Sequence, residues 1–405
     1  MKPALMRFIF ILIGSLLASA GAAAAQAPKA PANDDCLACH GDQSATRANG
    51  SSVAVSADIF GKSIHTGLAC VDCHADLAKT TEWPHAEKLQ PVSCATCHAD
   101  AVKVALTSVH YTEKSGKGAR CVDCHGTHDI RPASDPASRT YGLNLPKTCA
   151  QCHSGGTHME GPKGLVSGNY EDSVHGRGVA KSGLLVSANC TSCHGAHDIK
   201  TKTDPESRVH RTKIAATCTK CHEGIAPVYA KSVHAQQQRY GNTAAAVCSD
   251  CHTSHKIQRT GTDAWQLAAI EECGTCHLNK IATYRDTFHG QVTALGFTRV
   301  ATCSDCHGHH DILPLSNAAS AISSVNRVAT CRKCHAQASE NFAKYDPHAD
   351  KNDRYGSPAL YWSTKGMQAL LGGVFLFFGI HTLLWFPRSY LARRQRRADL
   401  KARAS

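Results

Sequence analysis

The cysteines of this 405-residue chain follow one rule, which restricts how the chain can fold. All 22 cysteines form pairs with two residues between the partners, and a histidine follows the second cysteine of every pair. A chain of this length can build conventional cores, so disulfide reinforcement of a small domain does not explain so many cysteines. The eleven motifs begin at Cys36, Cys70, Cys94, Cys121, Cys149, Cys190, Cys218, Cys248, Cys273, Cys303 and Cys331.

The C-x-x-C-H pattern is the attachment signature of c-type haem. Its two thiols add to the haem vinyl groups, and the adjacent histidine binds the iron as proximal ligand. Zinc ribbons also use paired cysteines but do not require a histidine beside the second one. We therefore expect eleven covalently attached haem c groups. Their second cysteines are Cys39, Cys73, Cys97, Cys124, Cys152, Cys193, Cys221, Cys251, Cys276, Cys306 and Cys334, and their proximal ligands are His40, His74, His98, His125, His153, His194, His222, His252, His277, His307 and His335.

The sixth iron ligand separates an electron carrier, whose irons are closed, from a catalyst with an open iron. Once a leader peptide is removed, only Met159 and Met367 remain, so methionine cannot cap eleven irons. Fifteen of the 26 histidines lie outside the attachment motifs. Histidine is therefore the expected ligand on both faces of every haem.

A repeat of two motifs indicates which histidines these are. Each module begins with an upstream histidine two positions after Ser or Thr, and a linking histidine follows three residues after its first motif. In the last four modules the two motifs start 28, 28, 25 and 28 residues apart, which indicates duplication of a two-haem module. After a leader motif at 36–40, the modules span about 63–98, 108–153, 173–222, 232–277 and 287–335.

The repeat predicts eleven distal ligands. The upstream histidines are His65, His110, His175, His234 and His289, and the linking histidines are His128, His197, His255 and His310, with His85 in that role in the irregular first module. The leader motif raises the number required to eleven, and His348 is the candidate for the remaining ligand. Its rivals are His158, His210 and His309. An isolated histidine can also be a solvated side chain, and this alternative stays open for His85 and His348.

The linking histidines have a geometric consequence. His125 and His128 are three residues apart, a span of at most about 10 Å of extended chain, so they do not easily reach both faces of one haem. We expect His128 to cap a neighbouring haem, and the same for the other linking histidines. Such cross-ligation would bring adjacent haems into near contact and provide a continuous path for electrons.

The N-terminus has the features of an export signal. Lys2 and Arg7 precede an apolar run, and small residues follow it, so we expect a signal peptide over 1–25. An uncleaved N-terminal anchor is the alternative, although the apolar run is short.

A second apolar run predicts a transmembrane helix over 366–387, followed by a basic tail over 388–405. Basic residues beside a span remain cytoplasmic, so residues 26–365 should face the periplasm from the inner membrane. Removing the two charges of the signal peptide and the net six of the tail from the formal +12 leaves about +4 for this part. A nucleic-acid-binding face is therefore not indicated.

The expected fold is mostly irregular. Residues 36–348 would hold eleven haems with few aromatic side chains, so haem itself should form the core. We expect repeated two-haem modules with short α-helices carrying the motifs, almost no sheet, and one C-terminal transmembrane helix.

The tandem C-x-x-C-H motifs and the Ser-Val-His segments before them resemble the multihaem c-type cytochromes of anaerobic and metal-respiring bacteria, over about 36–348. With its C-terminal anchor, the chain also resembles the cytochrome c subunit of inner-membrane complexes that contain a b-type cytochrome or another quinol-oxidising subunit. The resemblance implies electron transfer from quinol, through that membrane partner, to periplasmic electron acceptors, without an independent catalytic site. It is weakly specific for the pathway.

Two further points stay open. His381 lies inside the predicted span, where ionisable residues are usually functional, and it could ligate a b-type haem, contact a quinone, or hydrogen-bond a partner helix. The alternative function is a multihaem reductase for nitrite, hydroxylamine or sulfur oxyanions, with one open iron. An outer-surface metal reductase or filament subunit is a third possibility, which the inner-membrane span opposes.

Overall fold

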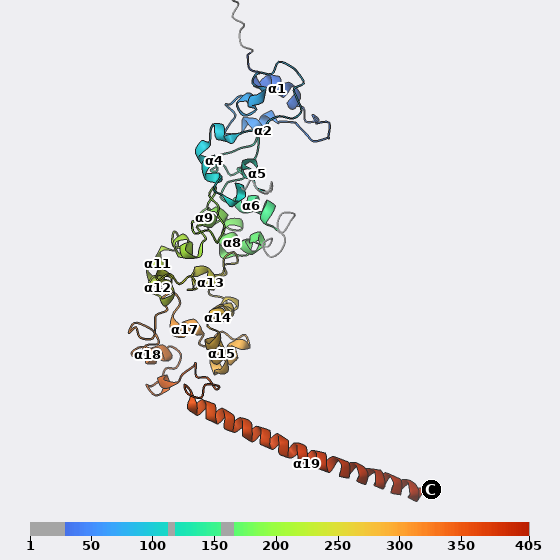
Figure 1. The fold of residues 1–405 in the computed structure, drawn as a ribbon, viewed down its shortest axis with the longest axis vertical. Helices are drawn as coiled ribbons and strands as arrows, with labels where there is room; N and C mark the ends of the chain where they lie inside the picture. The colour runs from blue at the N-terminus through green and yellow to red at the C-terminus, as the bar shows by residue number, and fades with distance from the viewer. Residues whose placement is uncertain (1–28, 112–117, 155–165, 405) are drawn as a thin grey trace, which may run out of the picture. The chain divides into compact units, whose positions relative to one another are not determined.

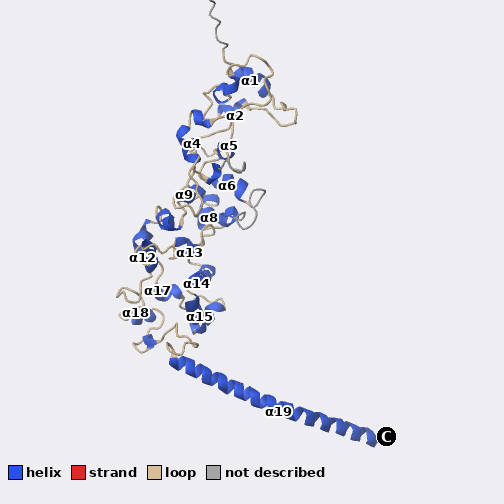
Figure 2. Cartoon of the chain, viewed as in Figure 1, coloured by secondary structure: helices blue, strands red, loops and turns tan. Residues whose placement is uncertain are grey.

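The computed structural model describes residues 29–111, 118–154 and 166–404, so the predicted signal peptide lies outside the described residues. Short helices joined by irregular loops make up most of this part of the chain (Figure 1). Within it there is no strand, only an isolated bridge between Thr46 and Ser52 (Figure 2). The predicted fold class, short helices with almost no sheet and one long C-terminal helix, is confirmed.

The attachment motifs lie on or beside short helices. The helices at the leader motif and at the first motif of each module are α1 (Asn33–His40), α3 (Cys70–Cys73), α5 (Cys121–His125), α9 (Cys190–His194), α13 (Cys248–His252) and α17 (Cys303–His307). Those at the second motifs are η2 (Cys94–Thr96), α6 (Leu145–His153), α10 (Ile214–Cys218), α14 (Asp263–Cys276) and α18 (Arg327–Arg332).

The remaining helices position the upstream histidines or connect the motifs. Four of them begin directly before an upstream histidine: η3 (Val109–Tyr111), α8 (Val174–Ala180), α12 (Val233–Arg239) and α16 (Phe288–Ala294). The connecting helices are α2 (Ala57–Gly61), η1 (Ala75–Leu77), α4 (Ala99–Ala105), α7 (Val166–Glu171), η6 (Arg211–Lys213), η7 (Glu223–Ile225), α11 (Ala226–Tyr229), α15 (Leu278–Asp286) and η8 (Phe342–Lys344).

The chain divides into two compact units. The first comprises Met1–Lys103 and Arg120–Ser138, and the second comprises Val104–Ala119 and Arg139–Ser405. The first unit thus contains the leader motif and the motifs at Cys70, Cys94 and Cys121. The second unit contains the other seven motifs. The division runs through the second predicted module, whose first motif lies in one unit and whose second motif lies in the other.

The last helix, α19 (Pro358–Ala404), is long and apolar enough to cross a membrane, judged by length and composition. Its 47 residues correspond to roughly 70 Å, more than the predicted 22-residue span requires. The helix continues through Pro387, which lacks the N–H for one intrahelical hydrogen bond, and into the basic tail. No part of its apolar window is buried against the rest of the chain.

The polypeptide has little apolar core of its own. Nine apolar side chains are buried among the described residues: Val71, Val179, Ala235, Ala245, Val247, Ile270, Tyr284, Ala338 and Ala343. So few buried apolar side chains indicate that the polypeptide folds around a group that supplies the missing core.

Candidate haem-binding site

The first motif of most modules forms its own helix cap. In the sequence C-x-D-C-H the aspartate accepts a hydrogen bond from the backbone N–H of the residue before the first cysteine. The four aspartates make this bond at 2.7–2.8 Å: Asp72 with Ala69, Asp123 with Arg120, Asp250 with Val247 and Asp305 with Thr302. Because the cap closes the N-terminal turn, both cysteines and the histidine are held on one short helix.

A turn with positive φ follows this helix. Gly126, Gly195 and Gly308 have φ of 84° to 86°, a conformation open mainly to glycine. The fourth module has Thr253 at this position, with φ of 62°. The turn ends the helix directly after the proximal histidine and redirects the chain before the linking histidine three residues later.

Each upstream histidine faces the second motif of its own module. The ring centroids are 6.1 to 6.3 Å apart in all five cases, and the ring planes are tilted by 43° to 57°. The pairs are His65 with His98, His110 with His153, His175 with His222, His234 with His277, and His289 with His335.

The linking histidines face backward along the chain. His128 lies 6.4 Å from His74, His255 lies 6.0 Å from His194, and His310 lies 5.9 Å from His252. Each of these three linking histidines therefore meets the first motif of the preceding module and not that of its own. This is the arrangement that cross-ligation requires.

The two ends of the repeat follow the same backward rule. His85 in the first module lies 5.9 Å from His40 of the leader motif, so the leader is equivalent to the first motif of a preceding module. The first motif of the last module has no following module, and its His307 instead lies 6.2 Å from His348. The ring of His348 thus faces the first motif of the last module, and the ring of His85 faces the leader motif.

The ring separations have the value that a haem iron between two imidazoles would produce. With iron–nitrogen bonds of about 2 Å, the two ring centroids are expected about 6.2 Å apart. Rings in direct contact would lie closer together than this, because nothing would separate them. Burial lowers the pKa of His110, His194 and His255, which favours the neutral imidazole that a metal binds. The residues present therefore fit a bis-histidine haem.

The remaining candidate ligands are placed as follows. His125 and His197 occupy the equivalent proximal and linking positions of the repeat, and their roles stay predictions from that register. His210 accepts a hydrogen bond from the Thr212 backbone and its ring meets no other histidine ring in the described chain. His309 is exposed, and His158 lies outside the described residues.

Among the described residues, no group of three or more His, Cys, Asp or Glu side chains is arranged to hold a metal ion. None of the 22 cysteines, all of which are described, forms a disulfide. The absence of disulfides among them is compatible with the attachment chemistry that the motifs predict.

A recurring backbone hydrogen bond joins the segment that carries an upstream histidine to the segment that carries a linking histidine. In four of the five modules, the residue before the upstream histidine donates its N–H to the carbonyl of an isoleucine two residues after the linking histidine of the next module. We call this bond the isoleucine latch. It joins Ile64 to Ile130, Val109 to Ile199, Val174 to Ile257 and Val233 to Ile312, at 2.8 to 2.9 Å.

The cysteines show the order of the motifs in space. The first thiols of two consecutive motifs interact in five places, and in one of them a hydrogen bond with the Cys218 thiol lowers the pKa of Cys248 to about 7. The five pairs are Cys36/Cys70, Cys94/Cys121, Cys149/Cys190, Cys218/Cys248 and Cys273/Cys303.

Four of the intervening steps are also short, because the second cysteine of a first motif interacts electrostatically with a cysteine of the next motif. The neighbours are Cys73/Cys97, Cys193/Cys221, Cys251/Cys273 and Cys306/Cys331. Within each compact unit, every motif therefore lies next to the motif that follows it in sequence. Haems attached there would form an unbranched row in sequence order.

Comparison with known proteins identifies part of the chain. Residues 36–124 match the protein-family model described as "Cytochrome c-type protein NrfB-like". This segment contains the leader motif and the motifs at Cys70, Cys94 and Cys121. No curated protein and no solved structure matches the chain.

Proposed function

We propose that this chain, a multihaem c-type cytochrome similar over residues 36–124 to NrfB-like proteins, binds eleven haem c groups and carries electrons from a membrane quinol-oxidising subunit to periplasmic acceptors. The observation that supports this most directly is the set of ten histidine ring pairs 5.9 to 6.4 Å apart, each containing the histidine of an attachment motif. The repeat register supplies His125 and His197 for the eleventh haem.

The residues of the chain have separate roles in this function. When bound, each haem supplies a one-electron ferric/ferrous couple. The two cysteines of a motif would hold the haem covalently, and the two histidines would bind its iron on both faces and keep it low-spin. Because the same two histidines would bind the ferric and the ferrous iron, little structural rearrangement would accompany the transfer of an electron. The contacts between consecutive motifs would keep neighbouring haems close, so each electron-transfer step would be short.

The paired histidines favour electron transfer over the reductase alternative. A reductase needs one iron with an open position for nitrite, hydroxylamine or a sulfur oxyanion. The leader haem had the least certain ligand by sequence, yet His85 faces His40 at 5.9 Å. His307 of the motif at Cys303 likewise faces His348 at 6.2 Å, which supports a closed iron there as well.

The helix α19 supports a membrane-anchored role. It passes through an apolar stretch and ends in a basic segment, which favours a cytoplasmic C-terminus and a periplasmic haem-binding part. The span is exposed along its length, so a membrane subunit such as a b-type cytochrome can pack against it. His381 within this span would face that subunit.

Electron paramagnetic resonance of the purified ferric protein, together with a haem count per chain, tests the proposal. A count near eleven with low-spin signals alone would support the bis-histidine electron carrier. A stoichiometric high-spin signal would mean an open iron and would instead favour the reductase.

A further inference from the structure

Consecutive modules in the second compact unit meet through a repeated interface. The isoleucine latch joins Val174 to Ile257 and Val233 to Ile312 across two of these boundaries. At the same boundaries, the first thiol of a module's second motif interacts with the first thiol of the next module, as Cys218 does with Cys248. The next module thus covers one edge of each second-motif haem site.

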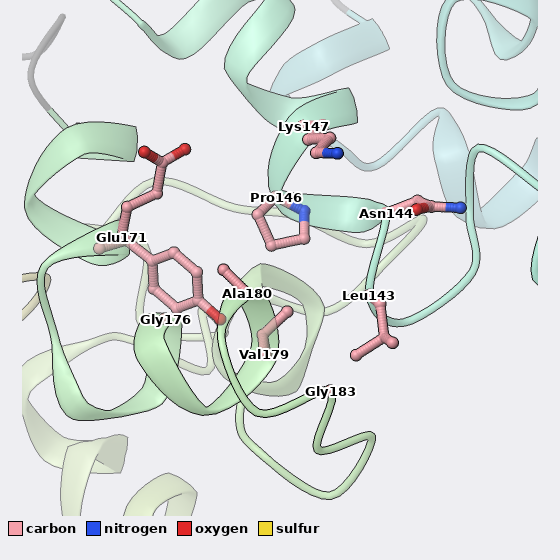
Figure 3. Close-up of a pocket in the computed structure, with 10 residues that line it drawn as sticks. Leu143, Asn144, Pro146, Lys147, Glu171, Gly176, Val179, Ala180 and Gly183 are labelled. Carbon is pink, nitrogen blue, oxygen red and sulfur yellow. The ribbon is translucent and has the colours of Figure 1, made fainter.

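In two modules, the segment before the second motif also contacts the next module. Asn189 of the third module donates to the Gly142 carbonyl at 3.4 Å, beside Leu143, which lies six residues before Cys149. Figure 3 shows Leu143 and Pro146 facing Val179 and Ala180 of α8 across a cavity of about 260 Å³. At the next boundary, Arg211 donates to the Ala245 carbonyl at 2.9 Å and forms an ion pair with Asp250.

The fifth module has no successor, and the corresponding positions are open. The N–H of Phe288, which is the latch donor by register, meets no carbonyl in the described part of the chain, and Phe288 is 73% exposed. Val325, six residues before Cys331, corresponds to Leu143 and is 75% exposed. We call Phe288, Val325 and Cys331 the terminal surface.

The C-terminal segment replaces only part of a sixth module. His348 takes the place of a linking histidine opposite His307. The Phe342 ring lies 5.0 Å from the ring of His335, and Arg327 donates to the Ala343 carbonyl at 3.5 Å. Neither contact fills the latch position at Phe288. The same segment continues into α19, so the last two haem sites are the ones nearest in sequence to the membrane helix.

We propose that the terminal surface docks a haem-bearing subunit of the membrane partner, in the place that a sixth module would occupy. The inference rests on the proposed function and names the surface through which electrons enter the chain. A haem-bearing occupant is expected because the repeat sets the pattern. At the earlier boundaries between modules, the corresponding edge of the second-motif haem site lies against the first haem site of the next module. The open latch position carries Phe288 where the other four modules have Ile or Val, and exposed aromatic side chains are typical of interface centres.

The test uses the full chain in membranes that contain the partner subunits. Added quinol releases two electrons and two protons to become quinone, and the haem absorbance of the chain reports how fast its irons are reduced. Phe288→Glu and Val325→Glu should each slow this reduction roughly tenfold or more, because a buried carboxylate at a docking surface is costly. Glu at the first turn of α16 is favourable for the helix, so the fold should be kept.

Val186→Glu is the matched control, because Val186 is 90% exposed in the third module and lies outside the terminal surface. Direct reduction by dithionite and the low-spin spectrum should be unchanged in all three variants. Site-specific photocrosslinking from position 288 should capture a subunit that contains non-covalent haem.

The outcomes separate the two proposals. If quinol does not reduce the wild-type chain in these membranes, the proposed function fails. If quinol reduces the wild type and both terminal variants equally fast, the docking proposal is overturned while the function stands. Crosslinking of position 288 to a second copy of this chain would also overturn it, since the surface would then be a dimer contact.

Discussion

At the scale of single residues, Thr253 occupies a backbone conformation that its side chain opposes. With φ of 62° and ψ of 177°, it lies in a region open almost only to glycine, at a cost of about 1–3 kcal/mol. Three other modules have glycine there. We expect Thr253→Gly to raise the free energy of unfolding by about 1 kcal/mol, because relief of strain exceeds the extra entropy of the unfolded glycine. Denaturant unfolding followed by the low-spin haem spectrum measures this.

The reverse change at the equivalent position of the third module is the control. A Cβ at Gly195 would lie 2.4 Å from Asp198 Oδ1, in addition to the strain at φ of 84°. Gly195→Ala should therefore destabilise the protein by about 1–2 kcal/mol. If Thr253→Gly lowers the free energy of unfolding as much as Gly195→Ala does, the turn is not strained at Thr253.

The linking histidine His255 allows a direct test of backward ligation. Its ring lies 6.0 Å from His194, whereas its own module's motif contains His252. His255→Ala should convert one haem, the one attached at Cys190, from low-spin to high-spin. Electron paramagnetic resonance should then show one high-spin signal per chain, and added imidazole should restore the low-spin form.

His210→Ala is the matched control, because His210 is a candidate ligand by sequence whose ring meets no other histidine ring in the described chain, and it should leave all haems low-spin. To identify the affected haem, His255→Ala is combined with Cys190→Ala and Cys193→Ala, which prevent attachment at that motif. The high-spin signal should then vanish. A signal that persists would assign His255 to another haem and contradict backward ligation.

At the scale of elements, the isoleucine latch connects α8 to the turn after α13. Val174 is the first residue of α8, a position where proline is tolerated, and Ser173 before it is extended with ψ of 164°. Val174→Pro therefore removes the latch donor without breaking the helix. The carbonyl of Ile257 loses its partner, so we expect the free energy of unfolding to fall by about 1–2 kcal/mol.

Phe288→Pro is the corresponding change where the N–H has no partner in the described chain. It should leave the unfolding free energy within about 0.5 kcal/mol of the wild type. Thermal unfolding of both variants compares them. If Phe288→Pro destabilises as much as Val174→Pro, the cost comes from the helix start and the latch contributes nothing.

The motifs and short helices could be predicted from sequence because both are local. The C-x-x-C-H spacing fits a single short helix, and the capping aspartate lies inside the motif in four modules, as Asp72 illustrates. The pairing of histidines could be predicted only in part. The three-residue separation of His125 and His128 predicts ligation of a neighbouring haem, but it does not say whether the preceding or the following one.

The direction depends on contacts between distant parts of the chain. Ser63 donates to the Ile130 carbonyl across 67 residues, and Ser108 donates to Ile199 across 91. No local pattern encodes such contacts. For this reason the sequence identified His85 and His348 as candidates, while the contacts that pair them with His40 and His307 emerge only from the fold.

At the scale of the whole molecule, the scarcity of buried apolar side chains makes folding depend on haem. Only nine such side chains are buried in the described chain, too few to offset the conformational entropy of several hundred residues. The paired histidine rings are connected only when an iron lies between them, and the isoleucine latches join the elements that carry those histidines. Haem attachment and folding should therefore occur together, module by module.

The membrane helix is separable from this haem-dependent body, because its apolar window is not buried against any of it. Deleting residues 366–405 should release a soluble protein that still contains all its haems and is reduced normally by dithionite. It should no longer accept electrons from quinol in membranes, since the anchor would no longer keep it beside its partner. Fractionation, haem count and haem absorbance after quinol addition measure these three properties.

The full-length chain with His381→Ala keeps the span and serves as the comparison, because it separates loss of the tether from loss of one side chain. Undiminished reduction of the truncated protein by quinol would show that the body alone recognises its electron donor, and that α19 contributes only attachment to the membrane.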